Sequence, residues 1–385
     1  MKPKKVPLGF FPTPLYELKH FGRRHTGHRI FIKRDDHTGL ASGGNKTRKL
    51  EYLLGDAIAR GADTVITGGA QQSNHCRQTA AACAMYGLAC HLMLGGEEPA
   101  RHTGNLLLSK MLGATIHFTG EKRKGEDMEQ LAGELRRQGR RPYLVTYGGS
   151  NAVGAMGYVE ASAELKKQLQ QQGIRIDYAF FASSSGGMQA GLSLGRAMYG
   201  LDTQWMPIQI DKAETGGMGL LENVRRIVQE AVLLLKGPDL PGPDISRQVN
   251  PDQSGPDSPR QTDVDTLGPD SPGQADTGVP GPAIPGLVDP DLLTPGVTRQ
   301  LDPDALFTIE GYEKAGYGVM TGKEREAILT LARTEGILLD PVYTGRAFHA
   351  MADHLEAGCL ERGTNVLFWH TGGLPANFSP NYSFF

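Results

Sequence analysis

Residues 41–50 (ASGGNKTRKL) place a lysine where its amine can become reactive. The Gly-Gly pair lets the backbone approach a ligand closely, and Asn45 is expected to cap the helix that follows. Lys46 then falls in the first helical turn, where the helix dipole disfavours a cation and lowers the pKa of an amine. Such an amine suits nucleophilic catalysis or a covalent bond to an aldehyde. A solvated lysine beside Arg48 and Lys49 is the alternative that this segment leaves open.

Polar residues gather at a second expected helix start, within residues 67–81 (TGGAQQSNHCRQTAA). An apolar strand is followed by a Gly-Gly turn, and Ser73, Asn74 and His75 open an Ala-rich helix. The N–H groups at a helix start point outward and bind carboxylate or phosphate groups. We therefore expect these three side chains, with Gln72, to border an anionic substrate. Simple N-capping by Ser73 is the alternative, and it explains one polar residue better than three.

A third segment, residues 180–195 (FFASSSGGMQAGLSLG), runs from a strand through a Ser-Gly bend into a helix. Hydroxyl groups and glycines at such a bend form a phosphate cradle. The segment is not a P-loop, because no Gly-Lys-Ser/Thr follows the bend. A merely flexible turn is the alternative for this segment taken alone.

Two further segments carry tyrosine or threonine beside turns, residues 335–347 (EGILLDPVYTGRA) and 368–376 (FWHTGGLPA). Tyr343 and Thr344 fall at an expected helix start, and Tyr317 lies in a Gly-flanked loop (GYGVM). A buried tyrosine often only finds a hydrogen-bond partner, so none of these is decisive alone. A helix-start lysine, a phosphate-type bend and several polar helix starts are nevertheless the parts that a pyridoxal phosphate (PLP) enzyme requires.

The elements expected around these segments alternate between strand and helix. This alternation predicts an α/β fold with parallel sheets and helices on both faces, in which ligands bind beyond the carboxyl ends of strands. The expected strands are residues 30–33, 64–67, 89–94, 115–118, 143–145, 178–182, 205–210 and 366–370. The expected helices are residues 46–59, 74–86, 123–138, 156–171, 219–235 and 323–335.

Residues 237–303 differ from the rest of the chain in composition. They hold 14 of the 24 prolines, with no aromatic residue, no lysine and no glutamate, and GPDSP occurs twice. Such a segment buries too little apolar area to offset its chain entropy. We expect a disordered insertion, more as a tolerated surface loop than as a partner-binding tail.

Composition excludes several classes of protein. A formal net charge of -2 argues against nucleic acid as the main partner, and no apolar run is long enough for a membrane helix. The prolines that follow the basic start argue against a secretory signal. The four cysteines form no C-x-x-C pair, so we expect free thiols in a reducing cytoplasm and no metal site. The absence of G-x-G-x-x-G argues against a nucleotide-dependent oxidoreductase, whereas a non-enzymatic binder stays open.

Five motifs in order resemble the D-cysteine desulfhydrase and 1-aminocyclopropane-1-carboxylate (ACC) deaminase family. They are GGNKTRKL, QQSNHCRQTAA, GGSNAVGAMGYVE, EGILLDPVYTGRA and HTGGLPA, and the resemblance covers about residues 12–219 and 311–378. The family implies a tryptophan synthase β-like fold (PLP fold type II), with two open, twisted, mostly parallel sheets flanked by helices. It also implies a large PLP-binding domain of residues 1–48 and 161–385, a small domain of residues 49–160, and a homodimer.

The resemblance also implies roles for individual residues. Lys46 would carry PLP, Asn74 would contact the ring hydroxyl, and Ser73 with Gln72 and His75 would border the substrate carboxylate. Tyr317 and Tyr343 match the catalytic tyrosines, and Thr344 and Thr371 lie at the cofactor. The expected phosphate ligands are Ser184, Ser185, Gly186, Gly187 and Met188. Met188 departs from the family pattern, which has threonine there, so a serine or Gln189 is expected to compensate.

Two positions point to the substrate. The ACC deaminases resembled here carry glutamate in place of Thr344, facing the ring nitrogen, and leucine in place of Thr371. A hydroxyl keeps the ring nitrogen protonated less well than a carboxylate, which weakens the electron sink. Loss of thiolate needs less of that sink than opening a cyclopropane ring does. The sequence therefore favours β-elimination from D-cysteine, with ACC deaminase or L-cysteate sulfo-lyase as the alternative.

Overall fold

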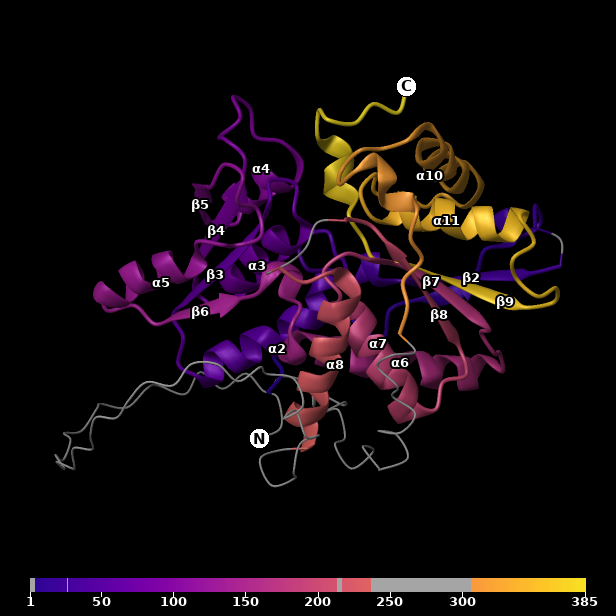
Figure 1. Cartoon of the computed structure of the whole chain (residues 1–385), viewed down its shortest axis with the longest axis horizontal. Helices are drawn as coiled ribbons and strands as arrows, with labels where there is room; N and C mark the ends of the chain where they lie inside the picture. Colours follow the sequence, from indigo (N-terminus) through magenta and orange to yellow (C-terminus); the bar gives the residue numbers. More distant parts are fainter. Residues whose placement is uncertain (1–3, 26, 213–216, 237–305) are drawn as a thin grey trace, which may run out of the picture.

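The computed structural model describes residues 4–25, 27–212, 217–236 and 306–385 (Figure 1). Within them, a five-stranded sheet has the order β1-β2-β9-β7-β8 and a four-stranded sheet has the order β5-β4-β3-β6. The strands are β1 (Leu15–Glu17), β2 (Arg29–Arg34), β3 (Thr64–Ala70), β4 (Ala89–Gly95), β5 (Thr115–Phe118), β6 (Pro142–Val145), β7 (Tyr178–Ser183), β8 (Gln204–Gln209) and β9 (Asn365–His370). Only β1 runs antiparallel to its neighbour, so the predicted fold class of two mostly parallel sheets is confirmed.

Apolar side chains alternate between the two faces of the five-stranded sheet. Ile30 and Ile32 of β2 join one core cluster, whereas Phe31 between them joins another. The first cluster is covered by helices α1 (Lys19–Gly22), α10 (Gly322–Glu335) and α11 (Thr344–Glu356). The second is covered by α6 (Ala152–Gln172) and α7 (Gly187–Tyr199), which α8 (Leu220–Lys236) packs against. Both faces are therefore buried, as parallel strands require.

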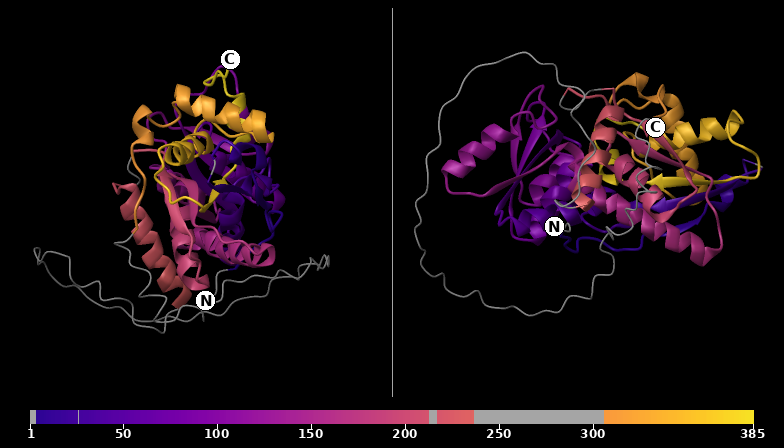
Figure 2. Two further views of the ribbon diagram at one scale, coloured as in Figure 1. Left: turned by 90° about the vertical axis from the view of Figure 1, so that its right-hand side faces the viewer. Right: turned by 60° about the horizontal axis from the view of Figure 1, so that its bottom comes forward.

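The four-stranded sheet is also covered on both faces. Val65 of β3 packs with α2 (Lys46–Ala59), α3 (Asn74–Met85) and α4 (Gly104–Met111), whereas Ile66 packs with α5 (Met128–Arg137). Figure 2 shows the two sheets lying side by side, with their helices around them. Short 3₁₀ helices complete the described part of the chain at Asp35–His37, Tyr147–Gly149, Tyr312–Ala315 and Leu374–Phe378.

The strands of the two sheets fall on opposite sides of the predicted domain division. All four strands of the smaller sheet lie within residues 49–160, and all five of the larger sheet lie outside that range. Helices α2 and α6 cross the two predicted boundaries and pack against each other. The boundaries at residues 48 and 160 therefore stay predictions.

The predicted elements are present, with some differences. All eight predicted strands occur, but the three-residue edge strand β1 and the short helices α1 and α4 were not predicted, and α6 begins at Ala152 rather than at residue 156. Helix α5 begins at Met128 rather than at residue 123, because local bonds compete with the helix there. Arg123 contacts Asp211, and the Lys124 N–H donates to Glu126 at 2.8 Å. The predicted insertion at residues 237–303 lies outside the described residues.

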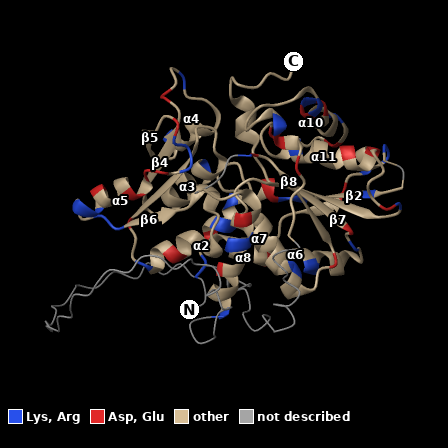
Figure 3. Ribbon diagram, viewed as in Figure 1, with Lys and Arg blue, Asp and Glu red and all other residues tan. Residues whose placement is uncertain are grey.

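The described chain has no helix long and apolar enough to span a membrane. Figure 3 shows basic and acidic residues spread over both halves of the molecule, without a face of one sign in that view.

Candidate active site

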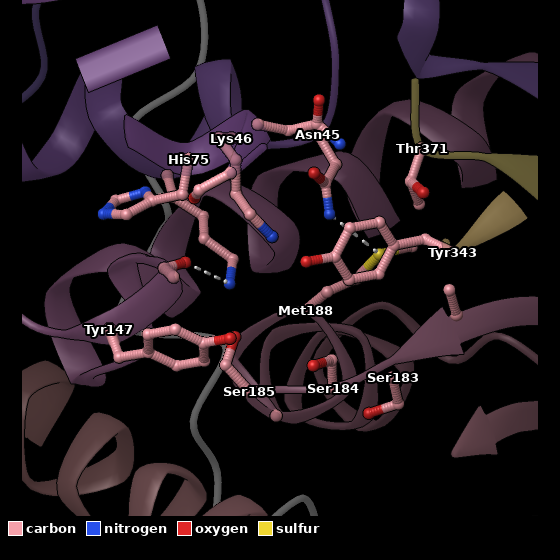
Figure 4. Close-up of a pocket in the computed structure, with 16 residues that line it drawn as sticks. Asn45, Lys46, His75, Tyr147, Ser183, Ser184, Ser185, Met188, Tyr343 and Thr371 are labelled. Atoms are coloured by element: carbon pink, nitrogen blue, oxygen red, sulfur yellow. Dashed lines mark hydrogen bonds between the residues drawn. The ribbon is translucent and has the colours of Figure 1, made fainter. Parts of the chain in front are cut away.

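The loops that follow four parallel strands meet at one cavity, between the two sheets. Strands β3 and β6 come from the smaller sheet, and β7 and β9 come from the larger one. The cavity is lined by Asn45, Lys46, Lys49, Ser73, Asn74, His75, Tyr147, Gly148, Ala182, Ser183, Ser184, Ser185, Gly186, Met188, Tyr343 and Thr371 (Figure 4). Two of these residues are lysines and none is a carboxylate. The cavity therefore suits a ligand with negative charge.

Lys46 is the first residue of α2, and its amine points into the cavity (Figure 4). The turn before it needs glycine at position 43, where φ is 67° and a Cβ would lie 1.9 Å from the Asp36 carbonyl oxygen. Burial lowers the pKa of Lys46 to about 8. No hydrogen-bond or ion-pair partner of its amine occurs among the described residues. The amine therefore has the surroundings of a nucleophile.

The expectation that Asn45 caps α2 is wrong. Asn45 itself has helical backbone angles, and its side chain makes no capping hydrogen bond. Its backbone N–H instead donates to the Thr371 carbonyl oxygen at 2.9 Å, which ties the loop to the end of β9. The Asn45 amide faces the cavity and lies 3.9 Å from the Met188 sulfur.

A second buried lysine, which the sequence analysis missed, lies at the same cavity. The Lys49 amine donates to the Gly148 carbonyl oxygen at 3.1 Å and to Ser150 Oγ at 3.0 Å. Burial, and then the nearby charge of Lys46, hold the pKa of Lys49 well below its usual value. A Cβ added at Gly187 would lie 2.8 Å from this amine, so Lys49 lies directly beside the Ser-Gly bend.

The Ser-Gly bend combines hydroxyl groups with the open start of α7. Gly186 precedes α7 with a φ of 81°, and Ser150 Oγ accepts from the Gly187 N–H at 3.2 Å. Ser150 and Ser185 share a hydrogen bond of 2.8 Å, so Ser150 is a second residue that the sequence analysis missed. Ser184 is partly exposed and lines the cavity. The bend thus offers hydroxyl groups and N–H groups beside the Lys49 amine, and such groups bind phosphate.

Gln189 does not take the place of the missing threonine hydroxyl at Met188. Its amide oxygen accepts from Ser183 Oγ at 2.7 Å, and its amide nitrogen donates to the Phe307 carbonyl oxygen at 2.8 Å. Both ends of the Gln189 amide are therefore engaged outside the cavity. The serines and Lys49 remain as the polar groups at the bend.

The start of α3 brings Ser73, Asn74 and His75 to the cavity, as predicted. Ser73 caps the helix by accepting from the Cys76 N–H at 3.2 Å. The N–H groups of the first two helical residues have no partner in the described chain, so they stay available to an anion. Gln72 does not line the cavity, because its side chain bonds to Thr103 and to the N–H of Asn105.

His75 is neutral, and its protonation is fixed by its neighbours. The Thr67 hydroxyl donates to the Val145 carbonyl oxygen at 2.9 Å, so at 2.9 Å from His75 Nε2 it can only accept. Nε2 therefore carries the proton, and the buried Nδ1 is an acceptor without a partner. Burial, reinforced by Lys46 and Lys49, holds the pKa of His75 well below its usual value.

Two tyrosines lie together at the cavity. The Tyr343 hydroxyl is 2.6 Å from that of Tyr317, and only Tyr343 lines the cavity itself. Burial raises the pKa values of both tyrosines well above the usual range, so both stay protonated at neutral pH. Tyr147, a further residue missed from the sequence, lines the opposite side, and burial raises its pKa to about 12.

Thr344 and Thr371, on which the expected substrate preference depends, have different surroundings. Thr371 lines the cavity, whereas the Thr344 hydroxyl donates to Asp340 Oδ1 at 2.6 Å and does not line it. Asp340 also accepts from three backbone N–H groups, those of Val342, Tyr343 and Thr344. Thr344 is therefore hydrogen-bonded to Asp340, a buried carboxylate whose two oxygens already accept hydrogen bonds.

The geometry thus unites most of the predicted residues around one amine. Among the predicted residues, Gln72, Gly187, Tyr317 and Thr344 do not line the cavity, although Gly187 and Tyr317 adjoin it through Lys49 and Tyr343. A lysine with a lowered pKa, opposite a bend rich in hydroxyl and N–H groups, fits an aldehyde that carries a phosphate. The glycine at position 187, where a Cβ would lie within 3 Å of Lys49 and Ser150, and the orphaned acceptor of His75 are consistent with that fit.

Comparisons with known proteins agree with this geometry. The family model described as "Pyridoxal-phosphate dependent enzyme" matches residues 6–232. A protein of Pyrococcus abyssi, named as a candidate ACC deaminase, is 35% identical over 97% of this chain and 93% of its own length. A protein of Pyrococcus horikoshii with the same name is 34% identical over the same shares.

Solved structures show the same fold. A crystal structure of an "ACC deaminase homologue" covers 97% of this chain and 93% of its own, with a TM-score of 0.72 and 33% identity. A hydrogen sulfide-producing enzyme of Fusobacterium nucleatum covers 98% of each chain, with a TM-score of 0.57 and 14% identity, and shows the fold alone. The chain therefore belongs to the pyridoxal-phosphate dependent enzymes, within the group of the D-cysteine desulfhydrases and ACC deaminases.

Proposed function

We propose that this enzyme carries PLP on Lys46 and eliminates the β-substituent of a small amino acid. The preferred substrate is D-cysteine, which with one molecule of water gives pyruvate, hydrogen sulfide and ammonia. The observation that carries this choice is the absence of aspartate and glutamate among the residues that line the cavity. Without a carboxylate at the ring nitrogen, expulsion of a good leaving group is favoured over the opening of a cyclopropane ring.

The carboxylate that binds Thr344 supports the same choice. Asp340 lies behind Thr344 and accepts hydrogen bonds from three backbone N–H groups as well as from the Thr344 hydroxyl. These donors stabilise its ionised form and occupy both of its oxygens. Asp340 therefore does not replace the glutamate of the ACC deaminases.

The cofactor and the substrate are held by different groups of the chain. When bound, PLP supplies the electron sink for negative charge at the α-carbon. Lys49, the hydroxyls of Ser184 and Ser185, and the N–H groups that begin α7 would hold its phosphate. The free N–H groups at the start of α3, beside Ser73, would bind the substrate carboxylate.

The residues of the chain also account for the two proton movements. The Lys46 amine, whose pKa burial lowers to about 8, takes the α-proton as general base. The carbon–sulfur bond then breaks and the sulfur leaves with its electron pair. Tyr343 faces the cavity and is hydrogen-bonded to Tyr317, so this pair can deliver a proton to the departing sulfur.

A second candidate function is ACC deamination, which the names of the Pyrococcus relatives favour. L-Cysteate sulfo-lyase is the remaining alternative. Purified enzyme should be assayed with D-cysteine, L-cysteine, L-cysteate and ACC, measuring sulfide or sulfite together with the 2-oxo acid. We expect kcat/KM for D-cysteine to exceed that for the other three compounds. A higher value for ACC would replace the proposed function by the second candidate.

The two threonine positions give a sharper test of substrate choice. Changing Thr344→Glu together with Thr371→Leu should move the ratio of kcat/KM values for ACC and D-cysteine toward ACC by about tenfold or more, roughly 1.4 kcal/mol. Thr371→Leu alone should move it in the same direction, because this side chain lines the cavity without a hydrogen bond to another described residue. Thr344→Val serves as a control that removes the hydroxyl without adding a charge.

Folding of the variants is checked by the visible absorbance of the bound cofactor. The two threonines do not set the substrate preference if folded double and single variants both keep the parent preference.

We also propose a homodimer and a cytoplasmic location, in line with the family resemblance and the free cysteines. Sedimentation of the purified protein tests the first of these.

A further inference from the structure

Arg77 is a buried cation that forms no ion pair in the described chain. It lies on α3 with no exposed surface, and no described carboxylate is within ion-pair distance. Its Nη2 donates to the Gly43 carbonyl oxygen at 2.7 Å, and its Nη1 donates to Asn74 Oδ1 at 3.2 Å and Asn105 Oδ1 at 2.7 Å. Its Nε has no partner. Burying an unpaired charge costs free energy. We therefore expect the charge of Arg77 to have a role in the neighbouring site.

Asn105, in the first turn of α4, completes the arrangement. Its Nδ2 donates both to Asn74 Oδ1 at 3.0 Å and to the Gln72 carbonyl oxygen at 2.9 Å. A guanidinium can only donate, so the oxygen end of the Asn105 amide must face Arg77. Both ends of that amide are therefore fixed by chemistry. Asn105 is a rigid second donor to Asn74.

The orientation of the Asn74 amide follows. Its Oδ1 accepts from Arg77 and from Asn105, so the amide cannot be reversed without placing an N–H₂ group against two donors. Its Nδ2 therefore lies on the other side, and no described residue accepts a hydrogen bond from it. Asn74 lines the cavity that contains Lys46. The amide is thus prepared to donate to a ligand there.

We propose that Arg77 is a positioning residue that turns the Asn74 N–H₂ toward the ring oxygen of PLP and places a positive charge, held in no ion pair, behind it. This inference rests on the proposed attachment of PLP to Lys46. The donor and the charge both favour the ionised ring oxygen over its protonated form. Through Gly43, the same guanidinium holds the loop that begins α2, so one side chain fixes both the Lys46 loop and the Asn74 amide.

The inference is tested on the enzyme loaded with PLP, in the absence of substrate. The absorbance spectrum is recorded against pH, because ionisation of the ring oxygen changes the visible band. Asn74→Ala and Arg77→Met should each reduce the band of the ionised form and raise its titration midpoint by about one pH unit or more. Arg77→Lys should recover part of the shift, because an ammonium keeps the charge but lacks the planar fork of donors with which the guanidinium reaches its three acceptors.

Two further variants separate positioning from general destabilisation. Thr79→Val perturbs α3 by removing a buried hydroxyl bonded to the His75 carbonyl oxygen, and it should leave the spectrum as in the parent. In the double variant Asn74→Ala with Arg77→Met, the shift should be smaller than the sum of the two single shifts, because Arg77 acts partly through Asn74. If Arg77→Met does not fold, Asn105→Ala is measured in its place, and we expect it to raise the titration midpoint by a smaller amount.

The outcomes are distinct. The inference is overturned if Arg77→Met, or Asn105→Ala in its place, keeps the parent spectrum and midpoint while Asn74→Ala shifts them. It is also overturned if Thr79→Val shifts them equally. If the parent enzyme itself carries no PLP on Lys46, the proposed function fails instead. A parent with the cofactor on Lys46 and unshifted variants leaves the proposed function intact.

Discussion

Lys46 and Lys49 lie one helical turn apart at the start of α2, yet their amines have different surroundings. Lys46 has no hydrogen-bond partner among the described residues, whereas Lys49 donates to Gly148 and Ser150. Burial lowers the pKa values of both, and the charge of Lys46 lowers that of Lys49 further. At the scale of the residue, Lys46 is therefore the amine that can react, and Lys49 is the one held beside the phosphate cradle.

The lowered pKa of Lys46 predicts how PLP uptake by the apoenzyme depends on pH. The neutral amine attacks the aldehyde, so the rate should rise with pH and level off above about 8. At pH 7.5 a pKa of about 8 leaves roughly a quarter of the amine neutral, against roughly a thousandth for an ordinary lysine. Stopped-flow absorbance measures the rate. A rate that still rises tenfold per pH unit at pH 9.5 would contradict the assigned pKa.

At the scale of the element, Arg346 joins three segments around the tyrosine pair. It lies on α11, bonds to Glu324 of α10 at 2.5 Å, and donates to the carbonyl oxygens of Gly316 and Val319 on either side of Tyr317. Glu324 in turn forms a capping box with Thr321 at the start of α10. Arg346 of α11, the helix that follows Tyr343, therefore holds the turn that carries Tyr317.

Removing this side chain should therefore be costly. Arg346→Met leaves Glu324 buried without a counter-charge, so we expect the free energy of unfolding to fall by about 3 kcal/mol or more. Arg346→Lys keeps the charge and should lose less. The double variant Glu324→Gln with Arg346→Met should recover part of the loss. Denaturant unfolding monitored by circular dichroism measures all three, and a loss below about 1 kcal/mol for Arg346→Met would count against this role.

The sequence could predict those site residues whose role is marked locally. Lys46, Ser73 and Ser184 each lie beside a Gly- or Ser-rich turn next to a helix, and all three line the cavity. Lys49 and Tyr147 were missed because their position depends on packing between α2 and the turn after β6, far apart in the chain. Lys49 lies in the motif GGNKTRKL and Tyr147 directly precedes the motif at residues 148–160, but neither motif suggested a role for these two residues.

The same reasoning explains the errors. Gln72 and Thr344 have residue types suited to ligand contact, but hydrogen bonds to Asn105 and Asp340 draw them away from the cavity. Asn45 was expected to cap α2, but its backbone is already helical. Residue type and motif cannot distinguish these outcomes, because each outcome depends on which neighbouring group forms the hydrogen bond in the folded chain.

At the scale of the whole molecule, a loop from the half that contains the smaller sheet contacts the half that contains the larger sheet. Arg123, between β5 and α5, donates to Asp211 Oδ2 at 2.7 Å, just beyond the end of β8. Its guanidinium carbon also lies 4.5 Å from the centre of the Tyr317 ring. Arg123 therefore joins the two halves beside the tyrosine pair, without lining the cavity itself.

Arg123→Met should loosen this contact. We expect faster amide hydrogen exchange in residues 312–320 and about a tenfold loss in kcat/KM, with an unchanged spectrum of the bound cofactor. Lys122→Met is the matched control, since the exposed neighbour Lys122 pairs with Asp127 inside the same loop. Equal behaviour of the two variants would show that Arg123 does not join the halves in solution.

The most direct test of the account is to locate the covalent bond. The purified enzyme is reduced with borohydride, digested, and its peptides are mapped by mass spectrometry. We expect the reduced pyridoxal phosphate on Lys46 alone, and its loss in Lys46→Ala, whereas Lys49→Met should retain it on Lys46 at lower occupancy. A modification on Lys49, or a stable label in Lys46→Ala, would contradict the account.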